Sequence, residues 1–325
     1  MSNIPEKDTA GGSLYKEEYS RLKNMVEAHI DRYIPDVDKR SSILYDAIKY
    51  SVDAGGKRLR PVLLLAACEA AGGDAAEALP FACAIEFIHT YSLIHDDHPS
   101  MDNDDLRRGK PTNHKVFGDD IAILAGDGLL NSGMDVMLEA VMAEADDALR
   151  ERKLRASYEI SRAAGVRGMV AGQTADVMMT GGGLEEHRKI YVELSEDQKP
   201  DMLRYIHRNK TGALIRASVR AGAVIGGASD NELEAFTDYA EKIGLVFQIV
   251  DDILDVVGDE DITGKKTGMD AELGKLTYPA VFGLEKSYEF AAIETQAAVD
   301  ALKNGSQVSS DFLEKLALDL QNRIS

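Results

Sequence analysis

The chain has 325 residues and a formal net charge of −19, from 37 Lys plus Arg against 56 Asp plus Glu. A protein this acidic will not bind nucleic acid through bulk electrostatics, and 44% hydrophobic residues with only 8 Pro exclude a disordered or fibrous chain. If its substrates are phosphates, cations or local basic clusters must reverse the repulsive field.

Helical periodicity dominates the sequence after a loose tail that we predict over residues 1–12. Apolar residues recur at three- and four-residue steps, whereas period-two alternation is nearly absent. We therefore predict one all-α domain over 13–325, in which the charged segment 184–200 is an exposed excursion between core helices. The predicted helical stretches are 16–34, 42–53, 61–71, 77–96, 119–143, 153–177, 201–225, 231–257, 289–303 and 311–323.

The two cysteines, Cys68 and Cys83, lie in apolar surroundings and show no metal-binding spacing. This pattern predicts two buried core thiols in a reduced intracellular setting. The N-terminal residues contain no basic segment followed by an apolar stretch, and no run of about 18 apolar residues occurs, so we expect neither a signal peptide nor a membrane span. The expected location is the cytoplasm.

The first basic motif along the chain is GGKRLRP at 55–61, which places Lys57, Arg58 and Arg60 after a glycine pair. Such a motif is a candidate anion site, although alone it is more often an exposed loop. Two later basic segments carry similar weight: RNKTG contains Lys210 and Thr211, and TGKKTGMDAELGKLTYP contains Lys265, Lys266 and Lys275.

An acidic and basic cluster occupies residues 96–110 and follows a helix that we expect Pro99 to end. Carboxylates for a metal with arginines beside them are what a diphosphate site needs, because Mg²⁺ bridges phosphate oxygens and guanidinium groups bind them in bidentate pairs. The alternative is a mixed-charge surface loop. The cluster consists of Asp96, Asp97, Asp102, Asp104, Asp105, Arg107, Arg108 and Lys110.

A carboxylate stripe follows on the helix through 239–256, where Gln248, Asp251, Asp252 and Asp255 fall at i, i+3, i+4 and i+7 on one face. Most of the remaining circumference is apolar, which indicates a buried helix. Three carboxylates without basic partners cannot stay buried and unpaired, so a hard divalent cation such as Mg²⁺ is the natural partner. A solvated surface stripe is the alternative.

These motifs together resemble the trans-isoprenyl diphosphate synthase, or polyprenyl synthetase, family. The first aspartate-rich motif is DDHPSMD at 96–102, followed by DDLRRGKPTNH, and the second is DDILD at 251–255. GGKRLRP, GQTAD at 172–176, KTG at 210–212 and FQ at 247–248 match in order. The two-residue expansion of the first motif and the run IHTYSLIHDD are most similar to bacterial-type farnesyl diphosphate synthases. The resemblance implies an isoprenoid synthase fold, a bundle of about ten or more helices around a deep central cavity, and a homodimer.

The resemblance also implies a magnesium site and its ligands. Three Mg²⁺ ions, for which Mn²⁺ can substitute, are expected between the two motifs, with Gln173 and Asp176 lining the metal side. His98 stands inside the first motif where Leu is usual, which leaves its role open. The implied metal residues are Asp96, Asp97, Asp102, Asp251, Asp252 and Asp255.

The substrates implied are isopentenyl diphosphate and an allylic diphosphate, either dimethylallyl or geranyl. The implied allylic and catalytic residues are Arg107, Lys210, Thr211 and Gln248, with Lys265 and Lys275 as further diphosphate contacts. The implied isopentenyl residues are Lys57, Arg60, His89 and Arg108.

The family positions that help to limit product length correspond to Tyr91 and Ser92. An aromatic ring there predicts farnesyl diphosphate, with geranylgeranyl diphosphate as the alternative. A class I terpene synthase and a non-catalytic synthase subunit are two more candidate functions. Both fit less well, because a terpene synthase needs no isopentenyl site and a non-catalytic subunit should have lost one aspartate motif, whereas both motifs are intact.

Overall fold

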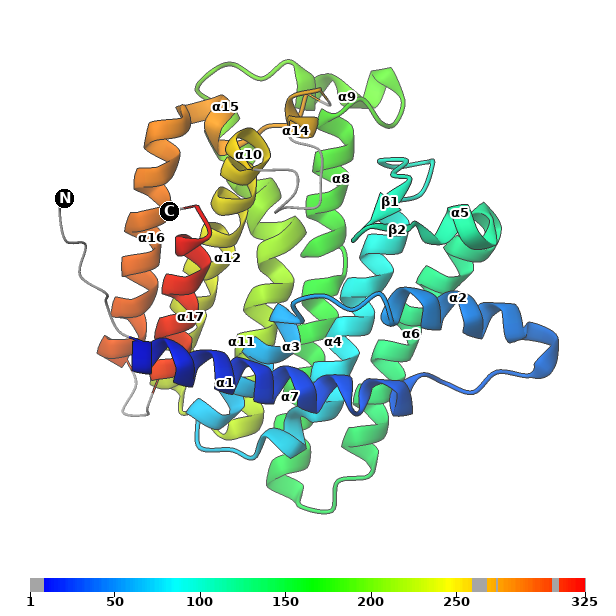
Figure 1. The fold of residues 1–325 in the computed structure, drawn as a ribbon, viewed down its shortest axis with the longest axis vertical. Coiled ribbons are helices and arrows are strands. Elements are labelled where there is room, and N and C mark those ends of the chain that lie inside the picture. Colours follow the sequence, from blue (N-terminus) through cyan, green and yellow to red (C-terminus); the bar gives the residue numbers. More distant parts are fainter. Residues whose placement is uncertain (1–8, 259–267, 273, 306–309, 325) are drawn as a thin grey trace.

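The computed structural model describes residues 9–258, 268–272, 274–305 and 310–324. Helices make up nearly all of the regular structure in this part of the chain, as the periodicity predicts (Figure 1). The first half contains α1 (Thr9–Glu27), α2 (Ser42–Val52), α3 (Leu59–Ala70), α4 (Ala75–Asp96), α5 (Asn113–Phe117), α6 (Asp119–Met142) and α7 (Asp147–Ala164). The second half contains α8 (Met169–Met179), α9 (Glu185–Val192), α10 (Lys199–Ile206), α11 (Gly212–Gly226), α12 (Asp230–Val257), α14 (Met269–Glu272), α15 (Tyr278–Phe282), α16 (Leu284–Gly305) and α17 (Asp311–Asn322).

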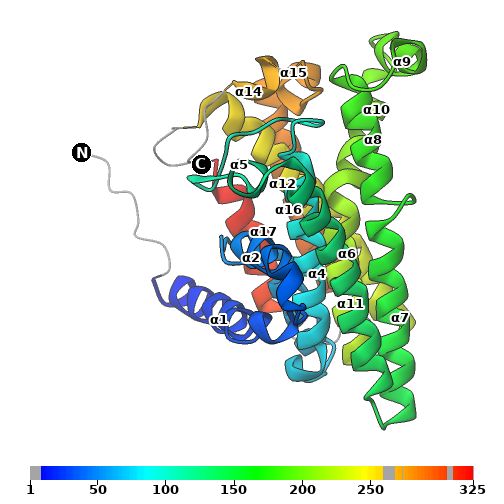
Figure 2. The ribbon, with the colours of Figure 1, turned by 90° about the vertical axis from the view of Figure 1, so that its right-hand side faces the viewer.

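The central helices are α3, α4 and α11, which are apolar on nearly every side and pack against one another. A helix of this kind is stable only when it is surrounded by other helices. Gly222 of α11 lets two of them approach closely, because a Cβ atom there would lie 2.0 Å from the carbonyl oxygen of Leu64. The helix α1 runs across the bundle, while α6 and α7 lie side by side at its edge (Figures 1 and 2).

The predicted stretch 16–34 consists of α1 and a separate 3₁₀ turn at Ile30–Tyr33, and two further predicted helices are interrupted. The stretch 153–177 divides at Gly165–Gly168 into α7 and α8, where a Cβ atom on Gly168 would lie 2.1 Å from the Ala163 carbonyl oxygen. The stretch 201–225 divides at a five-residue π-helical segment, His207–Thr211, between α10 and α11. Hydrophobic periodicity continues through both interruptions, so the sequence pattern could not reveal them.

Three loop regions add detail to the prediction. α1 begins at Thr9, inside the predicted tail, and α9 forms within the charged excursion, where Leu184 and Ile190 are exposed. A short hairpin that was not predicted joins β1 (Leu106–Arg107) to β2 (Lys110–Pro111). Its two-residue turn places Arg108 at φ 54° and Gly109 at φ 76°, as a type I′ turn requires.

Two expectations about composition can be compared with the fold. Cys68 and Cys83 are buried and free, as predicted. By length and composition α6 could cross a membrane, but the core helix of a bundle passes the same test, and α6 packs against α2, α4 and α7. We therefore assign no membrane span to it.

Candidate active site

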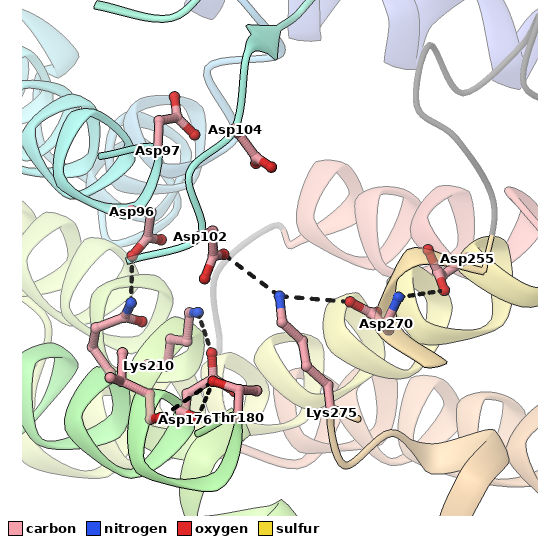
Figure 3. A network of polar contacts seen from close by, with 12 residues as sticks. Asp96, Asp97, Asp102, Asp104, Asp176, Thr180, Lys210, Asp255, Asp270 and Lys275 are labelled. Atoms are coloured by element: carbon pink, nitrogen blue, oxygen red, sulfur yellow. Dashed lines mark hydrogen bonds and ion pairs between the residues drawn. The ribbon is translucent and has the colours of Figure 1, made fainter. Parts of the chain in front are cut away.

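The first aspartate motif lies at the carboxyl end of α4, which ends at Asp96 three residues before Pro99. The loop then turns back on itself, because the Asp102 amide donates to the Asp96 carbonyl oxygen at 2.9 Å. This turn brings the carboxylates of Asp96 and Asp102 to the same side (Figure 3). The sequence placed them six residues apart, and the loop makes them neighbours.

The carboxylate of Asp96 lies deep in the site. Burial raises the pKa of Asp96 to about 6, while the charge of Lys210 opposes that rise. Gln173 of α8 donates a hydrogen bond from Nε2 to Asp96 Oδ1 at 2.5 Å. A buried carboxylate with one amide partner is a strong candidate ligand for a cation.

The neighbouring carboxylate, Asp97, is held by the hairpin. Arg107 Nε donates to both carboxylate oxygens of Asp97, at 2.7 and 2.8 Å, and Arg107 Nη2 also contacts Oδ1. Burial raises the pKa of Asp97, and the guanidinium lowers it again in part. The ion pair therefore holds the hairpin against α4 and places the Arg107 guanidinium group beside the aspartate motif.

The second motif lies in the last turns of α12, but its aspartates differ in environment. Asp251 is exposed, and Asp255 accepts a hydrogen bond from the Asp270 amide at 3.2 Å. Asp252 is only 5% exposed, accepts from the Tyr278 amide at 2.8 Å, and lies 3.7 Å from His207 Nε2. Burial raises the pKa of Asp252 well above its usual range. The structure thus buries Asp252 between two protein partners, whereas Asp251 is exposed and Asp255 is partly buried.

A chain of polar contacts joins the two motifs across the space between α4 and α12 (Figure 3). Lys275 Nζ lies 3.5 Å from Asp102 of the first motif and 3.6 Å from Asp270, whose amide reaches Asp255 of the second. The carboxylates from these distant segments therefore surround a common site. Sequence reasoning did not identify Asp270, since no regular spacing relates it to either motif.

The π-helical segment places Lys210 in the same site. Its backbone packs against Gly172 of α8, where a Cβ atom would come within 2.1 Å of the Lys210 nitrogen. The ammonium group lies 2.5 Å from Asp176 Oδ2. Burial lowers the pKa of Lys210, but the nearby carboxylates of Asp96 and Asp176 outweigh this and the net pKa is raised. Lys210 therefore stays a cation at the centre of the acidic site.

A second, basic group of side chains lies beside the first. Arg60 Nη1 is 3.3 Å from His89 Nε2, and burial lowers the pKa of Arg60 to about 10. Burial and the charges of Arg60 and Arg108 lower the pKa of His89 well below its usual range, so the ring is neutral. The Arg108 guanidinium lies against Gly56, where a Cβ atom would be 2.6 Å from its central carbon.

The basic motif at 55–61 also contains a structural residue. Arg58 is 3% exposed and donates to Glu27 at 2.9 Å, to Glu86 at 2.8 Å and to the Val52 carbonyl oxygen at 2.7 Å. Lys57, in contrast, is exposed, and its carbonyl oxygen accepts from the Tyr19 hydroxyl at 2.7 Å. Within the motif, Arg58 is therefore committed to protein partners, which leaves Lys57 and Arg60 for a ligand.

The remaining predicted site residues are the two chain-length positions, Thr211, Gln248 and Lys265. Tyr91 is 8% exposed and meets His95 edge to face, with ring centroids 5.4 Å apart. Ser92 donates to the His89 carbonyl oxygen at 2.8 Å, within α4. Thr211 and Gln248 are partly buried. Lys265 lies outside the described residues.

The donor set fits a hard divalent cation that is shared with a ligand. Among the described residues, no three His, Cys, Asp or Glu side chains gather closely enough to enclose a metal ion. Mg²⁺ is seldom caged by protein alone, since it retains water and binds one or two carboxylates plus substrate phosphates. Two facing carboxylate groups with a gap between them suit that mode of binding.

Three comparisons with known proteins agree with this geometry. The polyprenyl synthetase family model matches residues 41–313. The farnesyl diphosphate synthase of Geobacillus stearothermophilus is 48% identical over 282 residues, covering 87% of this chain and 89% of that protein. The heterodimeric geranylgeranyl pyrophosphate synthase large subunit 1 of Arabidopsis thaliana is 49% identical over 259 residues, covering 80% of this chain and 66% of that protein. The crystal structure of an FPP/GFPP synthase from Zymomonas mobilis superimposes with a TM-score of 0.78 at 31% identity, covering 95% of this chain and 99% of that one.

Proposed function

Because the chain belongs to the polyprenyl synthetase family and is a prenyltransferase, we propose that it condenses isopentenyl diphosphate with dimethylallyl and geranyl diphosphates. The observation that carries this proposal is the presence of two charged sites of different character. One is acidic with a central lysine, Lys210, and the other is basic, around Arg60 and Arg108. Two sites of opposite sign suit two diphosphates that bind differently.

The acidic site is the one for the allylic diphosphate. The family uses a divalent metal, and we infer Mg²⁺, with three ions held by Asp96, Asp97, Asp102, Asp251 and Asp255. When bound, the metal neutralises the charge that develops on the leaving diphosphate. We do not extend this role to Asp252, because its side chain is only 5% exposed and lies between the Tyr278 amide and His207.

The chain's own residues then perform four tasks. Arg107, Lys210, Lys275 and, by resemblance, Lys265 supply positive charge to the departing diphosphate, which has to leave before the allylic carbon can react. Thr211 and Gln248 lie where the allylic cation forms. The basic site positions isopentenyl diphosphate so that its double bond attacks this cation. The proton released goes to the departing diphosphate, and the apolar lining excludes water that would quench the cation.

The basic site is the one for isopentenyl diphosphate. Lys57, Arg60, Arg108 and neutral His89 offer cations and hydrogen bonds, and the nearby Glu86 carboxylate is bound by Arg58. Burial lowers the pKa of both Arg60 and Arg108, which marks a site that an anion would stabilise.

Changing Lys57 should separate the two substrates. Lys57→Ala is expected to raise the Michaelis constant for isopentenyl diphosphate by about tenfold or more, because one charge-assisted contact is lost. The Michaelis constant for the allylic substrate should change less than about twofold. Steady-state kinetics with each substrate varied in turn measures both values. Equal effects on both substrates would show that the motif supports structure rather than one site.

We propose farnesyl diphosphate as the product, with geranylgeranyl diphosphate as the alternative. Relatives named as farnesyl and as geranylgeranyl diphosphate synthases match at similar identity, 48% and 49%, so the proposal rests on Tyr91. Its buried ring lies on α4 about one turn before the aspartate motif, and we infer that a growing chain would extend along α4 toward this ring.

A class I terpene synthase and a non-catalytic synthase subunit both fit the site less well. A terpene synthase would have no use for the basic site around Arg60. A non-catalytic subunit would not need both aspartate motifs intact. The cytoplasmic location remains a prediction.

We also propose a homodimer, which the outer faces of α6 and α7 support. Six large apolar side chains are exposed on these two adjacent helices, more than isolated surface residues would explain. They are Ile123, Leu124, Leu138 and Met142 of α6, with Leu154 and Tyr158 of α7.

Sedimentation tests the dimer directly. At working concentration the wild-type protein should sediment at about twice the mass of one 35.4 kDa chain, because burying this face removes apolar surface from water. Leu124→Glu should shift the protein toward the monomer, while Leu184→Glu, on the exposed α9 segment, should leave the dimer intact. A wild-type monomer would contradict the assignment.

The function is tested by incubation of the protein with dimethylallyl and isopentenyl diphosphates plus Mg²⁺, with products identified by mass spectrometry. The expected product has fifteen carbons. Absence of any condensation, with the protein folded and dimeric, would favour the non-catalytic subunit. Cyclised products without use of isopentenyl diphosphate would indicate a terpene synthase.

A further inference from the structure

Two histidines that the proposed mechanism does not use lie side by side next to the first aspartate motif. His98 follows Asp97 in the loop, and His114 belongs to α5. Both are buried, and their ring centroids are 6.1 Å apart. In each ring Nε2 is buried without a hydrogen-bond partner among the described residues. Buried polar atoms are normally paired, so two such atoms in adjacent rings point to a shared partner.

The hydrogen bonds of the other ring nitrogens fix the tautomer of His98. The backbone amide of Ser100 donates to His98 Nδ1 at 3.1 Å, so Nδ1 must carry a lone pair. In a neutral imidazole the proton then resides on Nε2. His98 therefore has a buried donor that lacks an acceptor.

The opposite tautomer follows for His114. The Thr112 hydroxyl donates to the Asp104 carbonyl oxygen at 2.7 Å, so toward His114 Nδ1, 3.2 Å away, Thr112 Oγ1 can only accept. His114 Nδ1 therefore carries the proton, and Nε2 carries a lone pair. His114 has a buried acceptor that lacks a donor, which is the complement of His98.

We propose that one buried water molecule bridges His98 Nε2 and His114 Nε2, and that this bridge positions the aspartate loop. The water accepts from His98 and donates to His114, which satisfies both atoms at once. His98 is at the centre of the loop, since its carbonyl oxygen accepts from the amides of Met101 at 2.8 Å and Asn103 at 3.2 Å. His98 is thus a positioning residue for Asp102, which lies between Met101 and Asn103 in the loop.

The other end of the bridge is anchored. Asn113, next to His114, donates from Nδ2 to the Ala47 carbonyl oxygen and to Ser51 Oγ, both at 2.8 Å, which ties α5 to α2. A loop held to this fixed point keeps Asp102 in place before a cation or substrate arrives. Such preorganisation reduces the cost of binding. The functional part of the inference rests on the proposed metal role of Asp102.

Asparagine substitutions remove the bridge and little else. In His98→Asn the side-chain oxygen can still accept from Ser100, and in His114→Asn the side-chain amide can still donate to Thr112, so Nε2 is the one hydrogen-bonding atom that each variant loses. Either variant should raise the Mg²⁺ concentration that gives half-maximal activity by about fivefold, with the Michaelis constant for isopentenyl diphosphate unchanged within about twofold. The double variant should be no worse than a single one, because either change breaks the same bridge. Effects that multiply, or single variants like the wild type, would overturn the proposal.

A spectroscopic measurement tests the bridge separately from the proposed function. In ¹⁵N-resolved NMR spectra of the metal-free protein, His98 should be protonated at Nε2 and His114 at Nδ1. His114→Asn should shift the His98 Nε2 resonance, whereas Lys115→Ala, at an exposed neighbouring residue, should not. The same tautomer in both rings would overturn the bridge. The expected tautomers together with an unchanged Mg²⁺ requirement would keep the bridge and refute its positioning role, and with it the link to Asp102.

Discussion

Asp251→Asn is expected to lower the turnover number by about a thousandfold or more, equivalent to several kcal/mol of barrier. Asp251 is exposed, so the change removes a negative charge from the proposed metal site without disturbing the core. Asp97→Asn should have a similar effect on rate. Exhaustive chelation of divalent metal should abolish activity, and added Mg²⁺ should restore it. Single-turnover kinetics at saturating Mg²⁺ would measure the chemical step.

Two neighbouring carboxylates provide matched controls for this experiment. Asp105→Asn removes a charge from the loop that also carries Asp97 and Asp102. Asp105 is exposed and paired with Lys115 at 2.7 Å, so near-normal turnover is expected. The fold-decrease in turnover number should be at least about ten times smaller for Asp252→Asn than for Asp251→Asn, because the new side-chain oxygen still accepts from the Tyr278 amide. Near-normal turnover in Asp251→Asn, or full activity after chelation, would contradict the metal assignment.

Tyr91→Ala should lengthen the product from fifteen carbons to twenty or more. The ring is buried and rests edge to face on His95, one turn before Asp96, so its removal would open the path along α4 for a longer chain. Product distributions by mass spectrometry give the result directly. Ser92→Ala is the control, because the Ser92 hydroxyl bonds to the His89 carbonyl within the helix and its loss opens little space.

Stability measurements on the same variants separate a chain-length role from core packing. If Tyr91 only packs in the core, truncation should lower the free energy of unfolding by about 3–5 kcal/mol and leave the product length unchanged. If the ring limits the product, the variant should remain folded through denaturant titration and still form longer chains. A stable variant that stops at fifteen carbons would refute the chain-length assignment.

The sequence contained most of the fold because helix formation and burial leave local patterns. The apolar surroundings of Cys68 in α3 and Cys83 in α4 predicted that both thiols are buried, and Pro99 predicted the end of α4. The interruptions at Gly165–Gly168 and His207–Thr211 left no such pattern. The second lies at a close backbone contact between Gly172 and Lys210, which are far apart in the chain.

The candidate site, too, could be predicted from the sequence only where its residues lie close together along the chain. Spacing alone put Asp251, Asp252 and Asp255 on one helical face, and adjacency in the sequence placed arginines beside the first aspartate motif. Spacing could not separate Asp252 from its neighbours, because the Tyr278 amide that binds it lies 26 residues further along the chain.

By itself, then, the sequence determined the helices, the two aspartate motifs and the basic segments, since each depends on residues within a few turns of one another. Only the tertiary structure decided which of these meet. Lys275 contacts Asp102 across the bundle, Gln173 contacts Asp96, and the rings of His98 and His114 lie side by side. These contacts arise because burial of the apolar helix faces fixes how the helices pack, and that packing brings together polar groups that no local spacing relates.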